Sequence, residues 1–267
     1  MIKDFEFKEN YNVDDLVRIM SILRSEDGCP WDKEQTHDSI RNNFLEEVYE
    51  VVDAIDNDDN DGLKEELGDV LLQVVFHTQM EVEKGGFNLS DVADGICKKL
   101  ILRHPHIFGD VKADTSEKVL DNWDKIKMEE KGQQSYTDTL KSVPAAFPAL
   151  MRAAKVQKRA GKANFDWEDV YEPLFKVGEE LAELEEAIEN GCPMSISEEL
   201  GDLLFAVVNV SRFLKLDAEE TLNRATDKFI SRFEALEKLA NERNIDMKES
   251  TLEELDALWD EVKKKGF

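Results

Sequence analysis

The amino-acid sequence predicts an all-α protein built as a tandem pair of helical-bundle domains. Apolar residues recur with helical spacing along nearly the whole chain, and no segment alternates apolar and polar residues as a strand would. The stretches 46–76 and 179–209 align without a gap at a constant offset of 133 residues, with 14 of 31 positions identical. This internal repeat indicates two copies of one helical domain.

The expected helices follow from the apolar periodicity and from the Gly and Pro residues between them. In the first half they cover 36–56, 63–83, 88–103 and 116–130, and in the second half 146–160, 170–190, 195–215, 217–243 and 251–264. The polar stretch KGQQSYTDT separates the two sets and is typical of a linker. We therefore expect an N-terminal domain at 1–130, a linker at 131–139 and a C-terminal domain at 140–267.

The composition restricts the possible partners. Of 267 residues, 60 are acidic and 34 are basic, which gives a net charge of −26. Such a charge repels nucleic-acid backbones and disfavours a nucleic-acid partner. The charged N-terminus lacks an apolar signal core, no apolar run is long enough to cross a membrane, and the three cysteines are widely spaced. We expect a cytoplasmic protein without membrane or nucleic-acid partners.

Each half carries an EExxE motif on one expected helix and an EExxD motif at the start of the next. Residues three apart share a helix face, and a short turn between two helices favours antiparallel packing. The carboxylates should therefore converge and require a divalent cation, Mg²⁺ or Mn²⁺, as counter-charge. The alternative is a solvated acidic helix face. The two sets of expected metal ligands are Glu180, Glu183, Glu199 and Asp202, and Glu47, Glu50, Glu66 and Asp69.

The two motifs occur together with CPWDKEQTH at 29–37, RHPHIFGDV at 103–111 and NFDWEDV at 164–170. In this combination, and over essentially the whole chain, the sequence resembles the MazG nucleoside triphosphate pyrophosphohydrolases. The resemblance implies a helical bundle of the all-α NTP pyrophosphohydrolase type that assembles as a homodimer. It also implies Mg²⁺-dependent cleavage of an NTP or dNTP between the α- and β-phosphates, with a nucleoside monophosphate and pyrophosphate as products.

The resemblance maps the metal ligands of the second half onto the four acids named above. Lys176 lies one helical turn before Glu180 and could contact phosphate oxygens. Lys228 and Arg232 share a helix face and could clamp the triphosphate. Trp259 fits a base-stacking role, with a core position as the alternative. Either a carboxylate or a metal activates the attacking water, and Glu179 and Glu183 are both candidates for the carboxylate.

The first half keeps the equivalent cationic and aromatic residues at Lys99, Arg103 and Trp123. Asn43, however, stands where the offset places Lys176. Losing this cation should weaken triphosphate neutralisation, so we expect the C-terminal domain to be the main catalytic one.

Two other functions stay open at this point. One is a related pyrophosphohydrolase with narrower specificity, acting on dUTP, dCTP or phosphoribosyl-ATP. The other is a non-catalytic helical interaction protein whose acids are only solvated surface.

Overall fold

The computed structural model is helical throughout, and its described residues are 5–111, 115–130 and 132–264. No strand occurs within these ranges, so the predicted all-α class is confirmed. The chain divides into two units, Met1–Lys127 and Met128–Phe267. Residue 131, the first of the expected linker, lies outside the described residues, and a short helix begins within that linker at Tyr136.

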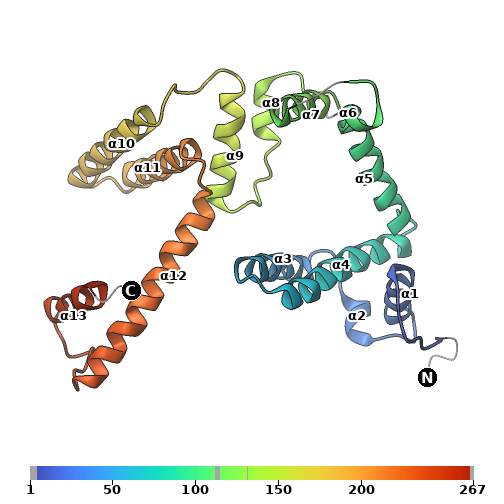
Figure 1. Ribbon diagram of the computed structural model, residues 1–267, viewed down its shortest axis with the longest axis horizontal. Coiled ribbons are helices and arrows are strands. Elements are labelled where there is room, and N and C mark those ends of the chain that lie inside the picture. Colours follow the sequence, from blue (N-terminus) through green and yellow to red (C-terminus); the bar gives the residue numbers. More distant parts are fainter. Residues whose placement is uncertain (1–4, 112–114, 131, 265–267) are drawn as a thin grey trace. The chain divides into compact units, whose positions relative to one another are not determined.

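The first unit contains the earlier helices of the chain, coloured blue to green in Figure 1, and the last of them passes the unit boundary. They are α1 (Val13–Leu23), α2 (Pro30–Glu34), α3 (Arg41–Asp56), α4 (Asn60–Glu83), α5 (Leu89–Arg103), α6 (Pro105–Phe108) and α7 (Ser116–Glu130). The expected helix at 36–56 starts later, at Arg41, because residues 37–40 form turns. The sequence analysis missed α1, although Asn12 and Asp15 form a capping box at its start.

Helices α3 and α4 lie side by side as a hairpin (Figure 1). Asp58 takes a left-handed backbone conformation with a φ of 53° at the turn. The Asp59 side chain then accepts hydrogen bonds from the backbone N–H groups of Asp61 and Gly62, which caps α4. The acidic turn therefore reverses the chain and places the two acidic motifs on neighbouring helices.

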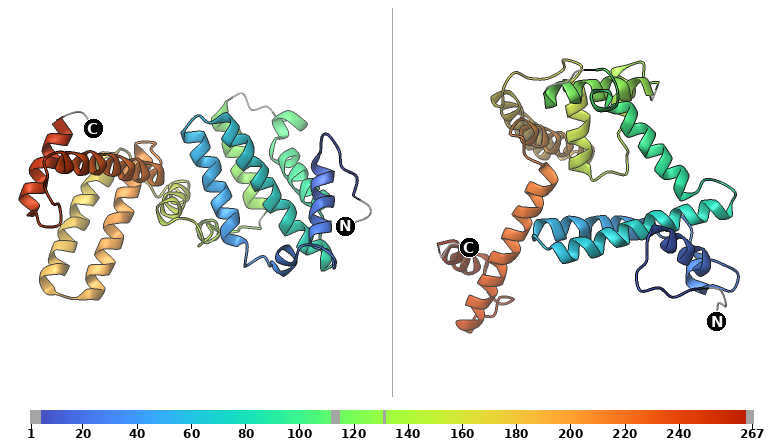
Figure 2. Two further views of the ribbon diagram at one scale, coloured as in Figure 1. Left: turned by 90° about the horizontal axis from the view of Figure 1, so that it is seen from below. Right: turned by 45° about the vertical axis from the view of Figure 1, so that its right-hand side comes forward.

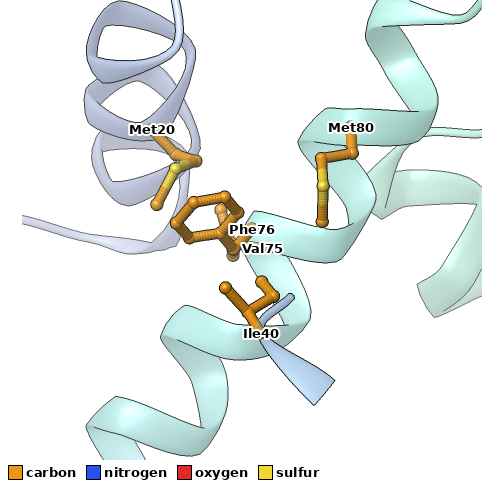
Figure 3. Close-up of a cluster of buried hydrophobic side chains, with 5 residues drawn as sticks. All are labelled: Met20, Ile40, Val75, Phe76 and Met80. Carbon is orange, nitrogen blue, oxygen red and sulfur yellow. The ribbon is translucent and has the colours of Figure 1, made fainter. Parts of the chain in front are cut away.

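A cluster of buried side chains fixes the position of α4 in the first unit (Figure 3). Met20 of α1 packs against Val75, Phe76 and Met80 of α4, and Ile40 joins them from the turn before α3. Burial of such side chains is the main favourable term in folding. The opposite side of α4 is thus left to pack on α3.

The second unit contains the later helices of the described chain. They are α8 (Tyr136–Lys141), α9 (Ala149–Gly161), α10 (Tyr171–Asn190), α11 (Pro193–Phe213), α12 (Ala218–Glu242) and α13 (Leu252–Lys264). The five helices expected in this half are all present with ends shifted by a few residues, and α8 was not expected.

Helices α10 and α11 form a second hairpin, visible side by side in Figures 1 and 2. Gly191 ends α10 in a left-handed conformation with a φ of 67°, which costs glycine little. Pro193 then occupies the first turn of α11, where its missing N–H needs no partner. These two residues set the tight reversal that the second pair of acidic motifs requires.

The remaining helices of this unit pack in sequence, with α8 on α9 and α9 on α11. Helix α9 packs against α11 and α12, and α13 packs on the C-terminal part of α12. The core between α12 and α13 consists of Leu236, Leu239, Ala240, Leu258 and Val262. Across the described residues of both units, we find no helix with the length and apolar character that crossing a membrane requires.

Candidate metal and nucleotide site

Each hairpin brings three carboxylates together. Oxygens of Glu180, Glu199 and Asp202 all lie within 4.8 Å of one another in the α10–α11 hairpin. The same holds for the equivalent acids of the α3–α4 hairpin, which are Glu47, Glu66 and Asp69. In both hairpins the first acid comes from one helix and the other two from the next, so the cluster depends on the packing of the pair.

The fourth expected ligand of each hairpin, Glu183 or Glu50, is not among the three acids whose oxygens lie within 4.8 Å of one another. Glu183 raises the pKa of Glu199 by charge repulsion, and Glu50 does the same for Glu47 and Glu66. Their carboxylates therefore belong to the same electrostatic cluster.

The pKa values of Glu199, Glu47 and Glu66 are raised above their ordinary value. Burial is the largest cause for Glu199, followed by repulsion from Glu183, Asp202 and Glu180. Burial is also the largest cause for Glu47 and Glu66. Desolvation and like charges both disfavour the ionised carboxylate. A bound cation would remove this penalty, so the electrostatics suit cation binding.

Lys176 distinguishes the second hairpin from the first. Its Nζ lies 2.7 Å from Oε1 of Glu180 and 3.5 Å from Oε2 of Glu179. The hydrogen bond to Glu180 is the main reason why the pKa of Lys176 is raised. The ammonium group thus sits at the edge of the carboxylate cluster, as its spacing from Glu180 suggested. In the first hairpin the equivalent residue is Asn43.

The other expected substrate residues of the second half do not join the cluster within the unit. Lys228 and Arg232 lie on α12, which leads away from the hairpin (Figure 1). The Trp259 ring of α13 contacts the Phe229 ring in a tilted arrangement, with ring centroids 5.2 Å apart, and packs against the α12–α13 core. In the chain as described, Trp259 is therefore partly a core residue.

The equivalent residues of the first half pack together as a separate group. The Arg103 guanidinium lies 5.5 Å from the centroid of the Trp123 ring, and the His104 ring contacts the same indole. Arg103 is buried, whereas Lys99 is exposed. The flat face of the guanidinium is thus occupied by an aromatic ring, as is common for arginine.

The sequence analysis missed a buried glutamine at the first cluster. Gln73 of α4 is 7% exposed, and its Nε2 donates a hydrogen bond of 3.4 Å to Oε1 of Glu47. Its own Oε1 is buried without a hydrogen-bond partner. The offset of 133 places Ala206 at the position of Gln73 in the second half. This difference between a polar and an apolar residue in the two repeats is the sequence signal that would have indicated Gln73.

A cavity on the other side of α11 was also missed. It measures about 440 Å³ and lies between α9 and α11. Its lining includes Arg152, Gly201, Leu204 and Phe205. A Cβ added at Gly201 would meet no neighbouring heavy atom within 4 Å, so this glycine leaves open space next to Asp202.

The CPWDKEQTH segment has a structural role in the described contacts. Arg24 pairs with Glu83 through two hydrogen bonds of 2.8 and 2.9 Å. The same guanidinium donates to the backbone carbonyl groups of Asp32 and Gln35 within that segment. These contacts hold the segment against α4. They give the CPWDKEQTH motif a structural role and no catalytic one.

Comparison with known proteins agrees with this arrangement. A model of the MazG nucleotide pyrophosphohydrolase domain matches residues 35–108 and 171–236, so each hairpin falls in one matched segment. The chain is 44% identical over 250 residues to the nucleoside triphosphate pyrophosphohydrolase/pyrophosphatase MazG of Thermotoga maritima, covering 94% of this chain and 95% of that protein.

It is also 44% identical over 257 residues to the nucleoside triphosphate pyrophosphohydrolase of Escherichia coli K12, covering 94% of this chain and 97% of that protein. A nucleoside triphosphate pyrophosphohydrolase of Mycobacterium tuberculosis is 41% identical over 152 residues, which cover 56% of this chain and 45% of that protein. The two matched segments and the long alignments show that the chain belongs to the MazG family of nucleotide pyrophosphohydrolases.

Proposed function

We propose that the chain hydrolyses nucleoside triphosphates and deoxynucleoside triphosphates to the monophosphate and pyrophosphate at the α10–α11 hairpin. One observation carries the choice of site. Oxygens of three carboxylates, those of Glu180, Glu199 and Asp202, lie within 4.8 Å of one another, and Nζ of Lys176 lies 2.7 Å from Oε1 of Glu180. The relatives named as nucleoside triphosphate pyrophosphohydrolases align across this region.

The donor set fits a hard divalent cation. Glu180, Glu199 and Asp202 supply only oxygen ligands, which Mg²⁺ and Mn²⁺ prefer, and Glu183 can extend the set. The three carboxylates carry a charge of −3, Glu183 adds a further −1 and Lys176 adds +1, so the cluster keeps an excess of negative charge that a divalent ion would largely offset. When bound there, Mg²⁺ would neutralise charge that develops on the phosphate oxygens.

The protein side chains then perform the remaining steps. With a cation held by Glu180, the Lys176 ammonium would be available to donate to a phosphate oxygen. A carboxylate, Glu179 or Glu183, accepts a proton from the attacking water. The oxygen of that water forms the new bond to the α-phosphorus, and the bond from that phosphorus to the bridging oxygen breaks. Pyrophosphate leaves with the bond electrons.

The first hairpin is proposed as the weaker site for hydrolysis. Asn43 stands where the second hairpin has Lys176. This difference removes one positive charge that a triphosphate could use. The acids Glu47, Glu50, Glu66 and Asp69 are proposed to bind a cation without efficient turnover.

A homodimer is the proposed assembly. Large apolar side chains are exposed on the second hairpin and on α12, among them Leu204, Phe205, Phe229, Ile230 and Phe233. Exposed apolar patches of this kind mark interaction surfaces. A second copy would cover them, and it would bring Lys228 and Arg232 of its α12 and Trp259 of its α13 close to a hairpin. Light scattering of the intact chain should give twice the monomer mass, and a monomer at micromolar concentration would contradict this assembly.

A panel of NTPs and dNTPs, dUTP, dCTP and phosphoribosyl-ATP, incubated with the chain and Mg²⁺, tests the function. The proposal expects pyrophosphate and a monophosphate from several members of the panel. Turnover confined to one member would instead support a narrow-specificity enzyme. An interaction protein would release no pyrophosphate and would show no effect of Mg²⁺ on stability. The cytoplasmic location and the absence of nucleic-acid partners stay predictions of the sequence.

A further inference from the structure

The α10–α11 hairpin is closed at one end by its turn and at the other end by an ion pair. Asp166 lies in the NFDWEDV segment that leads into α10, and Arg212 lies in the last turn of α11. Nη1 and Nη2 of Arg212 donate to the two carboxylate oxygens of Asp166, at 2.8 and 2.5 Å. The pair joins residues 46 apart in the chain, at the end of the hairpin opposite its turn.

Further contacts hold both partners of this pair in place. Nε of Arg212 donates a hydrogen bond of 2.8 Å to Oδ1 of Asn209, which is buried, and Cζ of Arg212 lies 4.6 Å from the centroid of the Phe213 ring. Oδ1 of Asp166 also accepts a hydrogen bond of 3.0 Å from the backbone N–H of Trp167. The side chains of Arg212 and Asp166 are 19% and 28% exposed. A partly buried bidentate pair of this kind fixes both the distance and the orientation of its partners.

Gly161, the last residue of α9, provides the room for the Asp166 carboxylate. A Cβ added at Gly161 would lie 2.6 Å from Oδ2 of Asp166, closer than side-chain carbons approach other atoms. The same oxygen accepts a hydrogen bond from Nη1 of Arg212. An alanine at position 161 would therefore push the carboxylate away from its partner without removing any charge.

The carboxylate cluster lies about midway between the turn and the ion pair. Glu180 is nine residues from the start of α10 and ten from its end, which corresponds to about 14 Å and about 15 Å along the helix axis. Asp202 is nine residues from the start of α11 and ten from Arg212, so the same distances apply along α11. With both ends of the hairpin fixed, the two helices cannot slide or spread where the acids meet. Without the ion pair, α10 could move against α11 with the turn as a pivot.

The first unit closes its hairpin at the same place with different residue types. His37 lies in the turn before α3, and its two ring nitrogens contact the C-terminal half of α4. Nδ1 of His37 lies 2.7 Å from Nδ1 of His77, and Nε2 of His37 lies 2.7 Å from Oε1 of Glu81. Each hairpin is thus fastened at its open end to the segment that precedes it. This recurrence with unrelated side chains indicates that the hairpin itself requires a closed end.

We propose that Asp166 and Arg212 are positioning residues for hydrolysis at the α10–α11 hairpin. Their ion pair holds the start of α10 against the end of α11, and so fixes the distances between the acids of the two helices. The inference rests on the proposed function of this hairpin and adds two residues that act through its acids. Because a misplacement of about 1 Å can cost about a hundredfold in rate, loss of the pair should be visible in kcat.

The test measures kcat and KM for ATP by pyrophosphate release, at a temperature where circular dichroism shows each variant of the intact chain to be folded. Arg212→Met removes the charge with little change in length and should lower kcat about 10- to 100-fold. Asp166→Asn and Gly161→Ala keep the arginine and should lower kcat about tenfold. Arg212→Lys keeps the charge and should recover part of the loss. A long-range effect of charge would instead make Arg212→Met and Asp166→Asn change the rate in opposite directions.

Arg243→Met is the matched control. Nη2 of Arg243 donates two hydrogen bonds of 2.7 Å to the carboxylate of Glu261 and so links the end of α12 to α13 instead of the hairpin helices. This variant removes an arginine from a comparable ion pair in the same unit. It should leave kcat and KM unchanged.

Mn²⁺ binding without nucleotide gives a second readout that needs no turnover. It is measured by the electron paramagnetic resonance of free Mn²⁺ in a chain carrying Glu66→Gln, which weakens the first cluster. Arg212→Met and Gly161→Ala, each added to this background, should weaken Mn²⁺ binding at the second cluster because its acids come from both helices. Arg243→Met should not.

Native kcat in folded Arg212→Met and Asp166→Asn would overturn the proposal, even if both variants lose stability, because the ion pair would then only support the fold. Unchanged Mn²⁺ affinity in both Arg212→Met and Gly161→Ala would also overturn it. If Arg212→Met does not fold, Asp166→Asn and Gly161→Ala decide the question by the same criteria. Failure of the proposed function would look different, because the native chain would then release no pyrophosphate or Glu199→Gln would leave its release intact.

Discussion

Substitution of Glu199 by Gln removes one charge from the α10–α11 cluster with little change in size. The cluster of Glu180, Glu199 and Asp202, with Lys176 beside it, changes from a net charge of −2 to −1. One of three carboxylate ligands is lost, and with it part of the charge stabilisation that a metal supplies in the transition state. We expect kcat/KM for ATP to fall by about a thousandfold or more.

The assay is initial-rate pyrophosphate release at several Mg²⁺ concentrations. Glu66→Gln is the matched control, because Glu66 occupies the equivalent position of the first hairpin, and it should retain most of the activity. A second signature follows from the repulsion that raises the pKa of Glu199. In EDTA, Glu199→Gln should unfold at a higher temperature than the native chain. Equal loss of activity in the two variants, or a Glu199→Gln enzyme with more than about a tenth of native activity, would refute the reasoning.

Three further predictions concern Lys176, the pH dependence of stability and the core of the first unit. Lys176→Asn copies the first hairpin into the second and removes a charged hydrogen bond to phosphate, so kcat/KM should fall about 10- to 100-fold in the same assay. The raised pKa of Glu199 means that the folded state binds the proton of this carboxyl group more tightly than the unfolded chain does. Protonated Glu199 therefore stabilises the fold below the ordinary pKa of a glutamate. This stabilisation is lost as the pH rises through the pKa of Glu199 in the folded state. In EDTA, the stability advantage of Glu199→Gln over the native chain, measured by urea unfolding, should therefore grow as pH rises above about 4.5 and should shrink when Mg²⁺ is added. Phe76→Ala leaves a cavity in the buried cluster between α1 and α4. It should lower the free energy of unfolding of the first unit by about 3–5 kcal/mol, measured by urea unfolding.

Local sequence patterns were sufficient for the longer helices from α3 on and for the two hairpins, but not for α1, α2, α6 and α8. The α10–α11 reversal depends on Gly191 and Pro193, whose conformational preferences act within a few residues. The convergence of the acids follows from the helix period and from antiparallel packing, both of which the repeat made visible. Helix α1 was not predicted, because the expected helices rest on apolar periodicity and the first of them begins at residue 36. The capping box of α1 is a local signal that would have indicated it.

Contacts between distant helices could not be predicted in the same way. The spacing of Lys228 and Arg232 places them on one face of α12 but does not specify which helix that face meets. The contact between the Trp259 and Phe229 rings depends on how α13 folds back onto α12. The unpartnered oxygen of Gln73 appears only when the packing of α3 on α4 is known, since an amide in a helix is usually solvated or satisfied.

Phosphorus NMR of ATP incubated with the intact chain and Mg²⁺, compared with the Glu199→Gln and Glu66→Gln variants, tests the central claim most directly. The predicted result is AMP and pyrophosphate in equal amounts from the native chain and from Glu66→Gln, with almost no product from Glu199→Gln. ADP and orthophosphate as products, or undiminished product from Glu199→Gln, would contradict the assignment of α–β cleavage to the α10–α11 hairpin.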